Sequence, residues 1–265
     1  MENNLKDVQN EKDLRGVDIQ KVGVKNVEVP LIVQRKNNSN QTVYAKARMN
    51  VSLPKHYKGT HMSRFIEVLS EWQHENMLGI DIKGCLNAII KKLHAQSAEV
   101  EFDFNYFIDK KSPVTKKAFP MSYECSFEGI MDKNGDIENY EFFLGVKIPL
   151  TTLCPCSKEI SEYGAHNQRA VVSVKLSYDE KHQIWIEDLV KMVEGCASSP
   201  IYSLLKRSDE KYVTEHAYEN PKFVEDVLRD VVIKLRENKA VKSFEVECES
   251  FESIHNHSAW AYQAE

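Results

Sequence analysis

The stretch that decides the fold is Thr42-Val43-Tyr44-Ala45-Lys46-Ala47-Arg48-Met49-Asn50-Val51-Ser52-Leu53. From Ala45 onward its apolar residues occupy every second position, and charged or polar residues occupy the positions between them. Side chains of a strand point alternately to its two faces, so this pattern predicts a strand that is buried on one face and exposed on the other. Residues 22–33, just before it, form another predicted strand.

Two helical patterns follow this pair of strands. Apolar residues recur at three- and four-residue intervals in two places: Met62, Phe65, Ile66, Leu69 and Trp72, then Ile82, Cys85, Leu86, Ile89, Ile90 and Leu93. Residues 100–106 alternate again and 120–131 are strand-like, so the order of elements is ββααββ.

The second half of the chain repeats that order. Predicted strands cover 138–150, 167–178, 241–252 and 257–263, and predicted helices cover 186–197 and 221–237. The pattern predicts an α+β fold, with an antiparallel sheet and helices on one face. We expect a flexible lead over 1–18 and one bimodular domain, with modules at 19–135 and 136–265. Such a sheet leaves open edges that invite pairing, so we also expect a homo-oligomer.

Composition excludes several classes of protein. The 265 residues include 35 Lys and Arg against 40 Asp and Glu, a net charge of −5 that disfavours a general nucleic-acid binder. The apolar run Val29–Val33 is far shorter than the ~20 residues that span a bilayer. The first seven residues lack a signal-peptide core, so we expect a cytoplasmic protein without a membrane partner.

The most unusual segment runs from Leu153 to Arg169 and contains Cys154-Pro155-Cys156 and His166. Thiols and imidazole are ligands that suit zinc or a similar divalent metal. The spacing is not that of a zinc finger, which favours a site with an open position for water. The alternative is two buried cysteines and an unrelated loop histidine.

Two other groups of residues could take part in chemistry. Glu252, His255 and His257 at a strand end could transfer protons near neutral pH, although an ordinary polar strand end is the plain alternative. A strand-to-helix junction carries cations that suit a phosphate, or that are simply solvated: Lys58, His61 and Arg64.

Two further carboxylates are open to more than one interpretation. A carboxylate in the predicted loop 206–211 could complete a metal shell, and nothing local distinguishes Glu210 from Asp209. Glu225, in the first turn of the predicted helix 221–237, either favours the helix dipole or accepts paired N–H groups from a purine or pterin.

The segments Thr152–Ser161 and Tyr163–Arg169 together resemble the type IB GTP cyclohydrolases. Supporting segments are Lys58–Phe65, Asp209–Glu215, Asn220–Asp226 and Glu252–His257, and the resemblance covers the chain from about residue 14 onward. One departure is Ser208, where the family pattern has proline. The resemblance implies the tunnelling fold (T-fold), in which ββααββ modules close into barrels, usually as a homotetramer. It also implies conversion of GTP and water to 7,8-dihydroneopterin triphosphate and formate, the first step of tetrahydrofolate biosynthesis.

The same resemblance implies roles for the candidate residues. Cys154, His166 and Glu210 would hold a divalent metal, Zn²⁺ or Mn²⁺ with Fe²⁺ as a further option, and the two cysteines could exchange roles. The implied proton-transfer residues are Cys156, Glu252, His255 and His257. Glu225 would bind the guanine edge, and the triphosphate would contact Lys58, His61 and Arg64.

Two other functions compete with this one. The first is a T-fold enzyme of the nitrile reductase type, with a cysteine nucleophile acting on a deazapurine or pteridine-like substrate. It would need NADPH, and the sequence has no glycine-rich dinucleotide fingerprint. The second is a non-catalytic, metal-stabilised scaffold.

Overall fold

The computed structural model describes residues 7–72, 76–77, 79–134, 137–179 and 181–265. It divides into two compact units: Met1–Phe104 with Ser126–Phe143, and Asn105–Cys125 with Leu144–Glu265. Three long strands contribute residues to both units: β4 (Ser97–Lys111), β5 (Ala118–Asn134) and β6 (Ile137–Leu153). The two units therefore do not coincide with the modules expected at 19–135 and 136–265, and the duplication stays a prediction.

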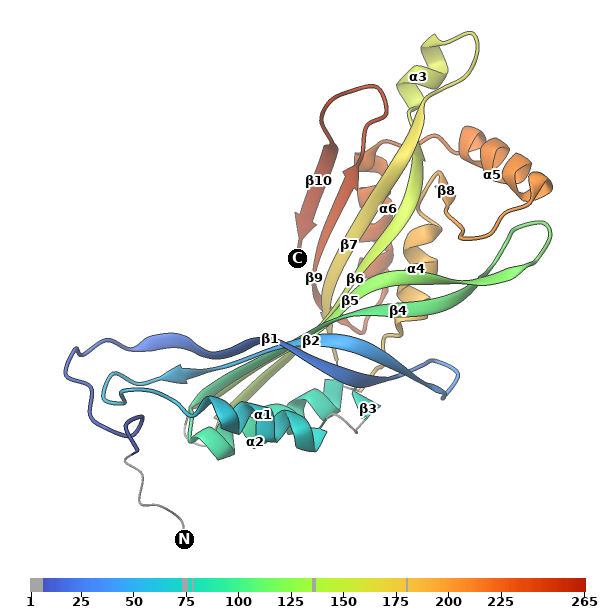
Figure 1. Ribbon diagram of the computed structural model, residues 1–265. Coiled ribbons are helices and arrows are strands. Elements are labelled where there is room, and N and C mark those ends of the chain that lie inside the picture. The colour runs from blue at the N-terminus through green and yellow to red at the C-terminus, as the bar shows by residue number, and fades with distance from the viewer. Residues whose placement is uncertain (1–6, 73–75, 78, 135–136, 180) are drawn as a thin grey trace. The chain divides into compact units, whose positions relative to one another are not determined.

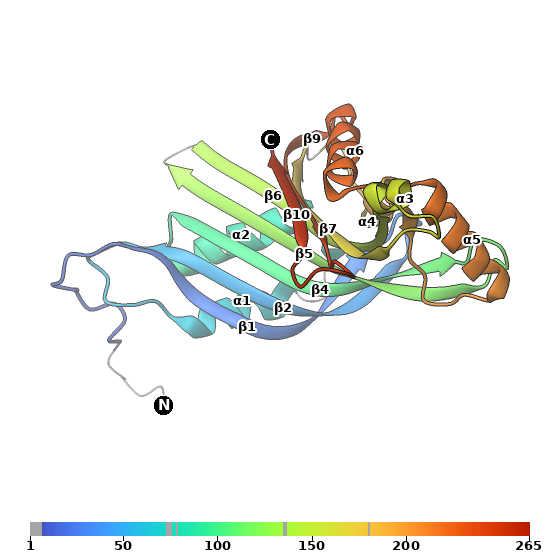
Figure 2. The same cartoon turned by 90° about the horizontal axis from the view of Figure 1, so that it is seen from above.

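The first unit is built on antiparallel strands with two helices. β1 (Ile19–Gln34) pairs with β2 (Asn40–Leu53), which pairs in turn with β4, as Figure 2 shows. The short β3 (Asn76–Met77) adds a parallel pair to β1. Helices α1 (Met62–Trp72) and α2 (Gly79–Leu93) lie on one face of these strands (Figure 1). The alternation read from 42–53 is confirmed, because its apolar face is buried: Ala45, Ala47, Met49, Val51 and Leu53.

The two helices differ in how well their buried faces were predicted. In α2 the predicted face is buried from Ile82 to Ile90. In α1 the prediction was wrong at Met62 and Ile66, which are exposed, while Val68 is buried. Met62 and Ile66 are one turn apart, so both fall at the same margin of the buried stripe and face solvent together.

A glycine allows α2 to pack closely on the sheet. A Cβ atom built on Gly129 of β5 would lie 2.3 Å from Ile82 Cγ2 and 3.0 Å from Leu86 Cδ1. Such distances lie well inside van der Waals contact, so no larger residue fits there unless the side chains of Ile82 and Leu86 move.

Part of the N-terminal segment that we expected to be a flexible lead is held in place. The backbone N–H of Asp13 donates to His56 O, and the N–H groups of Lys58 and Gly59 donate to Glu11 O and Gln9 O. These bonds tie residues 9–13 to 56–59, so this stretch is ordered by backbone pairing that its polar composition did not predict.

In the second unit the strands are ordered β10-β9-β7-β6-β5-β4, and the pairs β7–β9 and β9–β10 are antiparallel. The strands beyond β6 are β7 (Asn167–Tyr178), β9 (Val241–Ser250) and β10 (Ala259–Ala264), and the short β8 (Ser199–Pro200) pairs with β6. Helices α4 (Ile186–Glu194) and α6 (Val224–Glu237) bury apolar stripes, that of α6 being Val224, Val227, Leu228, Val231, Val232 and Leu235.

Two helices of this unit were not predicted. α3 (Pro155–Ile160) follows β6, and α5 (Arg207–Glu219) occupies the segment that we expected to begin with a loop at 206–211. α5 buries only Asp209 and Ala217, so it lacks the apolar stripe by which helices are recognised in sequence. In the described part of the chain, no helix has both the length and the apolar character needed to cross a membrane.

Candidate active site

Cys154 directly follows β6 and His166 directly precedes β7, one on each side of α3 in the sequence. Figure 1 shows α3 in the connection between these two strands. The backbone N–H of Cys154 donates to His166 O at 3.1 Å. Cys154 is the N-cap of α3, and its Sγ accepts from the Ser157 N–H at 3.3 Å. Ser157 Oγ in turn accepts from the His166 N–H at 3.2 Å. The short helix thus closes a loop that brings the two predicted ligands to one end of the sheet.

A chain of side-chain hydrogen bonds continues from His166 to Glu252. His166 Nδ1 lies 2.9 Å from Gln168 Oε1, and Gln168 Nε2 lies 3.3 Å from both Glu252 Oε1 and Thr152 Oγ1. Thr152 is buried and shares a 3.2 Å hydrogen bond with the buried Ser250. The structure therefore brings one predicted metal ligand and one predicted proton-transfer residue into a single network.

We did not predict site roles for Gln168, Thr152 or Ser157. A signal for Gln168 was present: it lies two positions after His166 at the start of a predicted strand, and alternate residues of a strand share a face. Ser157 carried no comparable signal, because its role depends on α3, which the sequence did not predict.

Glu210 lies in the first turn of α5 and is exposed. Its neighbour Asp209 is buried and accepts four hydrogen bonds, from the N–H groups of Val114, Thr115 and Lys206 and from Thr115 Oγ1. Burial alone would raise the pKa of Asp209, but these bonds outweigh it and hold the pKa well below its usual range. The structure thus separates two carboxylates that the sequence could not tell apart: Asp209 is fully engaged, and Glu210 faces solvent.

His255 and His257 lie in the loop between β9 and β10, both exposed. Their rings are stacked, with centroids 5.2 Å apart and planes 14° from parallel. Cys156 is exposed on α3, and Glu225 is exposed in the first turn of α6, as predicted. These four side chains are accessible, as proton-transfer or substrate-binding groups must be.

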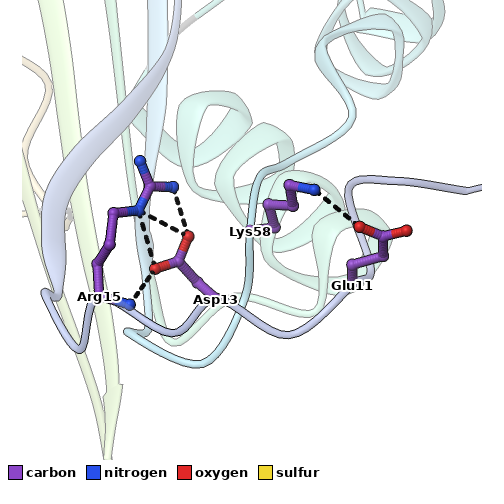
Figure 3. A network of polar contacts seen from close by, with 4 residues as sticks. All are labelled: Glu11, Asp13, Arg15 and Lys58. Atoms are coloured by element: carbon purple, nitrogen blue, oxygen red, sulfur yellow. Dashed lines mark hydrogen bonds and ion pairs between the residues drawn. The ribbon is translucent and has the colours of Figure 1, made fainter.

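The three predicted triphosphate contacts belong to the first unit, where Lys58 and Arg64 already have partners and His61 Nε2 is buried without a hydrogen bond to the described residues. Lys58 Nζ pairs with Glu11 at 2.7 Å, beside the Asp13–Arg15 ion pair, as Figure 3 shows. His61 Nε2 lies 3.3 Å from Asp7 Oδ2, and Arg64 Nη1 donates to Lys92 O at 3.3 Å. A phosphate would have to compete with a carboxylate for Lys58, so its role stays a prediction.

The second unit also contains a polar cluster made of residues that we did not predict as site residues. Lys110 Nζ contacts Glu194 Oε1 at 2.6 Å, Tyr123 OH donates to the same oxygen at 2.9 Å, and Lys110 lies 4.5 Å from the Tyr202 ring centroid. Burial lowers the pKa of Lys110, and Glu194 partly offsets that effect. Burial, with the Glu194 charge, raises the pKa of Tyr123. Every member has a partner, so we assign this cluster to stability.

Comparison with known proteins gives the family. The model of the family described as "Type I GTP cyclohydrolase folE2" matches residues 5–261. This chain belongs to that family. It is 50% identical over 257 residues to GTP cyclohydrolase FolE2 of Geotalea uraniireducens, covering 97% of this chain and 92% of the relative. It is 52% identical to the Thermosipho africanus protein of the same name, covering 97% and 96%.

The solved structures confirm the fold of this FolE2 family member. A uricase from Bacillus fastidious matches with a TM-score of 0.58 at 9% identity, covering 93% of each chain. A urate oxidase from Bacillus sp. TB-90 matches with a TM-score of 0.56 at 9% identity, covering 93% of this chain and 98% of that one. The α+β T-fold prediction is thus confirmed. The family match also favours the cyclohydrolase over the nitrile reductase and scaffold alternatives.

The resemblance to the type IB GTP cyclohydrolases implies a divalent metal, and the residues present fit it in part. The backbones of Cys154 and His166 are hydrogen-bonded to each other, so a residue with a thiol and a residue with an imidazole are neighbours, and Gln168 supplies the second hydrogen bond that metal-bound histidines make. Glu210 is not gathered with them: within the described residues, no three Cys, His, Asp or Glu side chains lie close enough to hold an ion. Two of the three expected ligands are therefore adjacent, and the third is a proposal.

Proposed function

We propose that this chain converts GTP and water to 7,8-dihydroneopterin triphosphate and formate, the reaction that the name of its family indicates. The observation that supports the proposal best is the hydrogen-bonded chain His166–Gln168–Glu252. It joins a thiol–imidazole pair suited to a divalent metal with a carboxylate suited to proton transfer, in the segments that resemble the family most.

The proposed ligands are Cys154, His166 and Glu210, with Zn²⁺, Mn²⁺ or Fe²⁺ as the ion. When bound, such an ion supplies a water molecule of lowered pKa for hydrolysis. The thiolate and imidazole would select a borderline metal over Mg²⁺ or Ca²⁺, which prefer oxygen ligands. Cys156 is next to this pair on α3 and is our candidate for proton transfer there.

The remaining residues act on the substrate itself. The Glu225 carboxylate would accept the guanine N1–H and amino N–H groups, which fixes the ring by two hydrogen bonds. Glu252, His255 and His257 would move protons as the five-membered ring opens and formate leaves. Triphosphate contacts by Lys58, His61 and Arg64 would require Lys58 to leave Glu11.

A homotetramer also remains part of the proposal. β10 is the terminal strand of the described sheet, and it carries the exposed Trp260 and Tyr262. An edge strand with exposed aromatic residues favours pairing with another chain. Light scattering of the purified protein measures the mass directly, and a monomer at micromolar concentration would contradict this part.

The test of the function is product identification. The protein is stripped of metal with a chelator, incubated with GTP, and supplied separately with Zn²⁺, Mn²⁺ or Fe²⁺. We expect no formate from the stripped protein and restored formation of formate and dihydroneopterin triphosphate, identified by mass spectrometry, with at least one ion. Full turnover after chelation would refute the metal requirement, and a different product would refute the reaction.

Glu225→Gln separates substrate binding from the metal. It exchanges one of the two acceptor oxygens for a donor that opposes the guanine N–H groups. We expect GTP affinity to fall by at least about tenfold, since one charged hydrogen bond contributes about 1.5–3 kcal/mol, while metal content is unchanged. Asp226→Asn, one position along the same helix, is the matched control.

A further inference from the structure

Gln168 bridges two functional groups, and the direction of its amide determines what it does to each. Its Oε1 lies 2.9 Å from His166 Nδ1, and its Nε2 lies 3.3 Å from Glu252 Oε1 and from Thr152 Oγ1. Gln168 is half-buried in β7, so solvent does not replace these partners fully.

The chemistry of Glu252 fixes the direction of that amide. An ionised carboxylate only accepts hydrogen bonds, so the group that faces it must be the amide NH₂. The reversed amide would place a carbonyl oxygen against a carboxylate oxygen and lose the hydrogen bond. Thr152 hydroxyl can donate or accept, so it is compatible with the direction that Glu252 sets and does not oppose it.

The direction of the amide in turn determines the tautomer of His166. The Gln168 carbonyl oxygen is only an acceptor, so the ring nitrogen that faces it must carry the proton. A neutral imidazole with its proton on Nδ1 has its lone pair on Nε2, and that lone pair is what a metal binds. The backbone of His166 is fixed independently by Cys154 and Ser157, so the ring is constrained from both ends.

We propose that Gln168 is a positioning residue. Its NH₂ group donates to Glu252, its carbonyl oxygen therefore faces His166 Nδ1 and keeps the proton on that nitrogen, and His166 Nε2 stays available to a divalent metal. The link to the metal rests on the proposed function. The tautomer itself does not, because it follows from hydrogen bonds within the chain. Gln168 touches neither substrate nor metal in this proposal.

A purely structural role is the alternative to be excluded. β7 and β9 are already joined by an antiparallel ladder from Ala170–Ser250 onward, and the Phe251 N–H donates to Arg169 O at 2.9 Å. Gln168 is therefore not required to join these strands, and a change there should leave the sheet intact while altering the ring of His166.

The first measurement is made on protein without metal. Histidine ¹⁵N shifts distinguish the Nδ1–H from the Nε2–H tautomer, and the His166 signal is identified by its loss in His166→Asn. We expect the Nδ1–H form in the parent and a shift towards the Nε2–H form in Gln168→Met, which keeps the length of the side chain but not its hydrogen bonds. Gln183→Met is the control, since that amide contacts Tyr178 OH and Ile184 O instead.

The second measurement is Zn²⁺ affinity by competition with a chromogenic chelator. Loss of such an outer hydrogen bond typically weakens metal binding 10–100-fold, and we expect a loss in that range for Gln168→Met and none for Gln183→Met. The double variant Gln168→Glu with Glu252→Gln exchanges the donor and the acceptor of this hydrogen bond. Because a carboxylate at 168 still accepts from His166 Nδ1, we expect the tautomer and the affinity to be retained.

The outcomes separate this proposal from the proposed function. An Nε2–H tautomer in the parent protein, or an unchanged tautomer in Gln168→Met, would overturn the proposal even if the protein is a fully active cyclohydrolase. A changed tautomer with unchanged Zn²⁺ affinity would overturn its link to the metal. The expected tautomers in a protein that forms no product from GTP would leave the positioning role supported and refute the reaction instead.

Discussion

Replacing Glu194 with glutamine tests whether the Lys110–Glu194 pair stabilises the fold. Each side chain is only 12% exposed, and Glu194 Oε1 receives both Lys110 Nζ and Tyr123 OH. Glu194→Gln keeps the shape and an acceptor for Tyr123 but leaves the Lys110 ammonium without a counter-charge. Breaking a buried pair costs about 3–5 kcal/mol, and the remaining exposure reduces this to about 2–3 kcal/mol.

Urea unfolding of the metal-free protein, at one protein concentration, measures this loss. Glu215→Gln is the matched control, because Glu215 pairs with Lys211 on the exposed face of α5, where such a pair contributes about 0.3–0.5 kcal/mol. We also expect Lys110→Met combined with Glu194→Gln to recover most of the loss, since no unpaired charge then remains. Equal losses for Glu194→Gln and Glu215→Gln would refute the reasoning.

The same variant should show a distinctive pH dependence. Burial lowers the pKa of Lys110, and removing Glu194 takes away the charge that opposes this effect. Between the folded pKa and the unfolded value of about 10.4, the unfolded chain binds more protons, so stability rises with pH. The deficit of Glu194→Gln should therefore narrow as the pH approaches 10, and a widening deficit would contradict the assignment.

Three further predictions follow from particular contacts. Gly129→Ala should destabilise the protein by about 1–3 kcal/mol in the same urea assay, because its Cβ would lie 2.3 Å from Ile82 Cγ2; an unchanged midpoint would show that α2 moves freely. The pKa of Asp209 is lowered in the folded protein, so its carboxylate contributes fully to the free energy of unfolding above the unfolded pKa of about 3.9, and this contribution is lost as the pH falls below that value. The difference in free energy of unfolding between the parent and Asp209→Asn should therefore shrink in acid, and a constant difference would contradict this. Burial raises the pKa of Cys85 and Cys248 to about 12, so a thiol reagent at pH 8 should modify the exposed Cys156 in the native protein before either of them, as peptide mapping would show.

The sequence predicted most of the sheet because period-two alternation is a local property. Residues 42–53 and 167–178 were correctly placed as strands from their own side chains. Helix α5 was missed for a physical reason: it is polar on nearly every side and is anchored by Asp209 to residues 114 and 115, about 95 positions away. No window of local sequence contains that contact.

In the candidate site, too, local contacts could be predicted from the sequence and long-range contacts could not. The proximity of Cys154 and His166 could be anticipated, since they lie twelve residues apart between two strands. The link from Gln168 to Glu252 spans 84 residues and depends on the register of β7 against β9. Side-chain direction and register are set by tertiary packing, so the sequence indicated which segments matter but not which atoms meet.

The long spans within this network have a consequence for how the enzyme matures. Thr152 and Ser250 meet across 98 residues, and Gln168 and Glu252 across 84. Contacts between such distant segments form slowly, because the chain must close a large loop before they can stabilise it. A nascent or refolding chain should therefore acquire its helices early and the hydrogen-bonded chain His166–Gln168–Glu252 last, so the formation of this chain would mark the final step of folding.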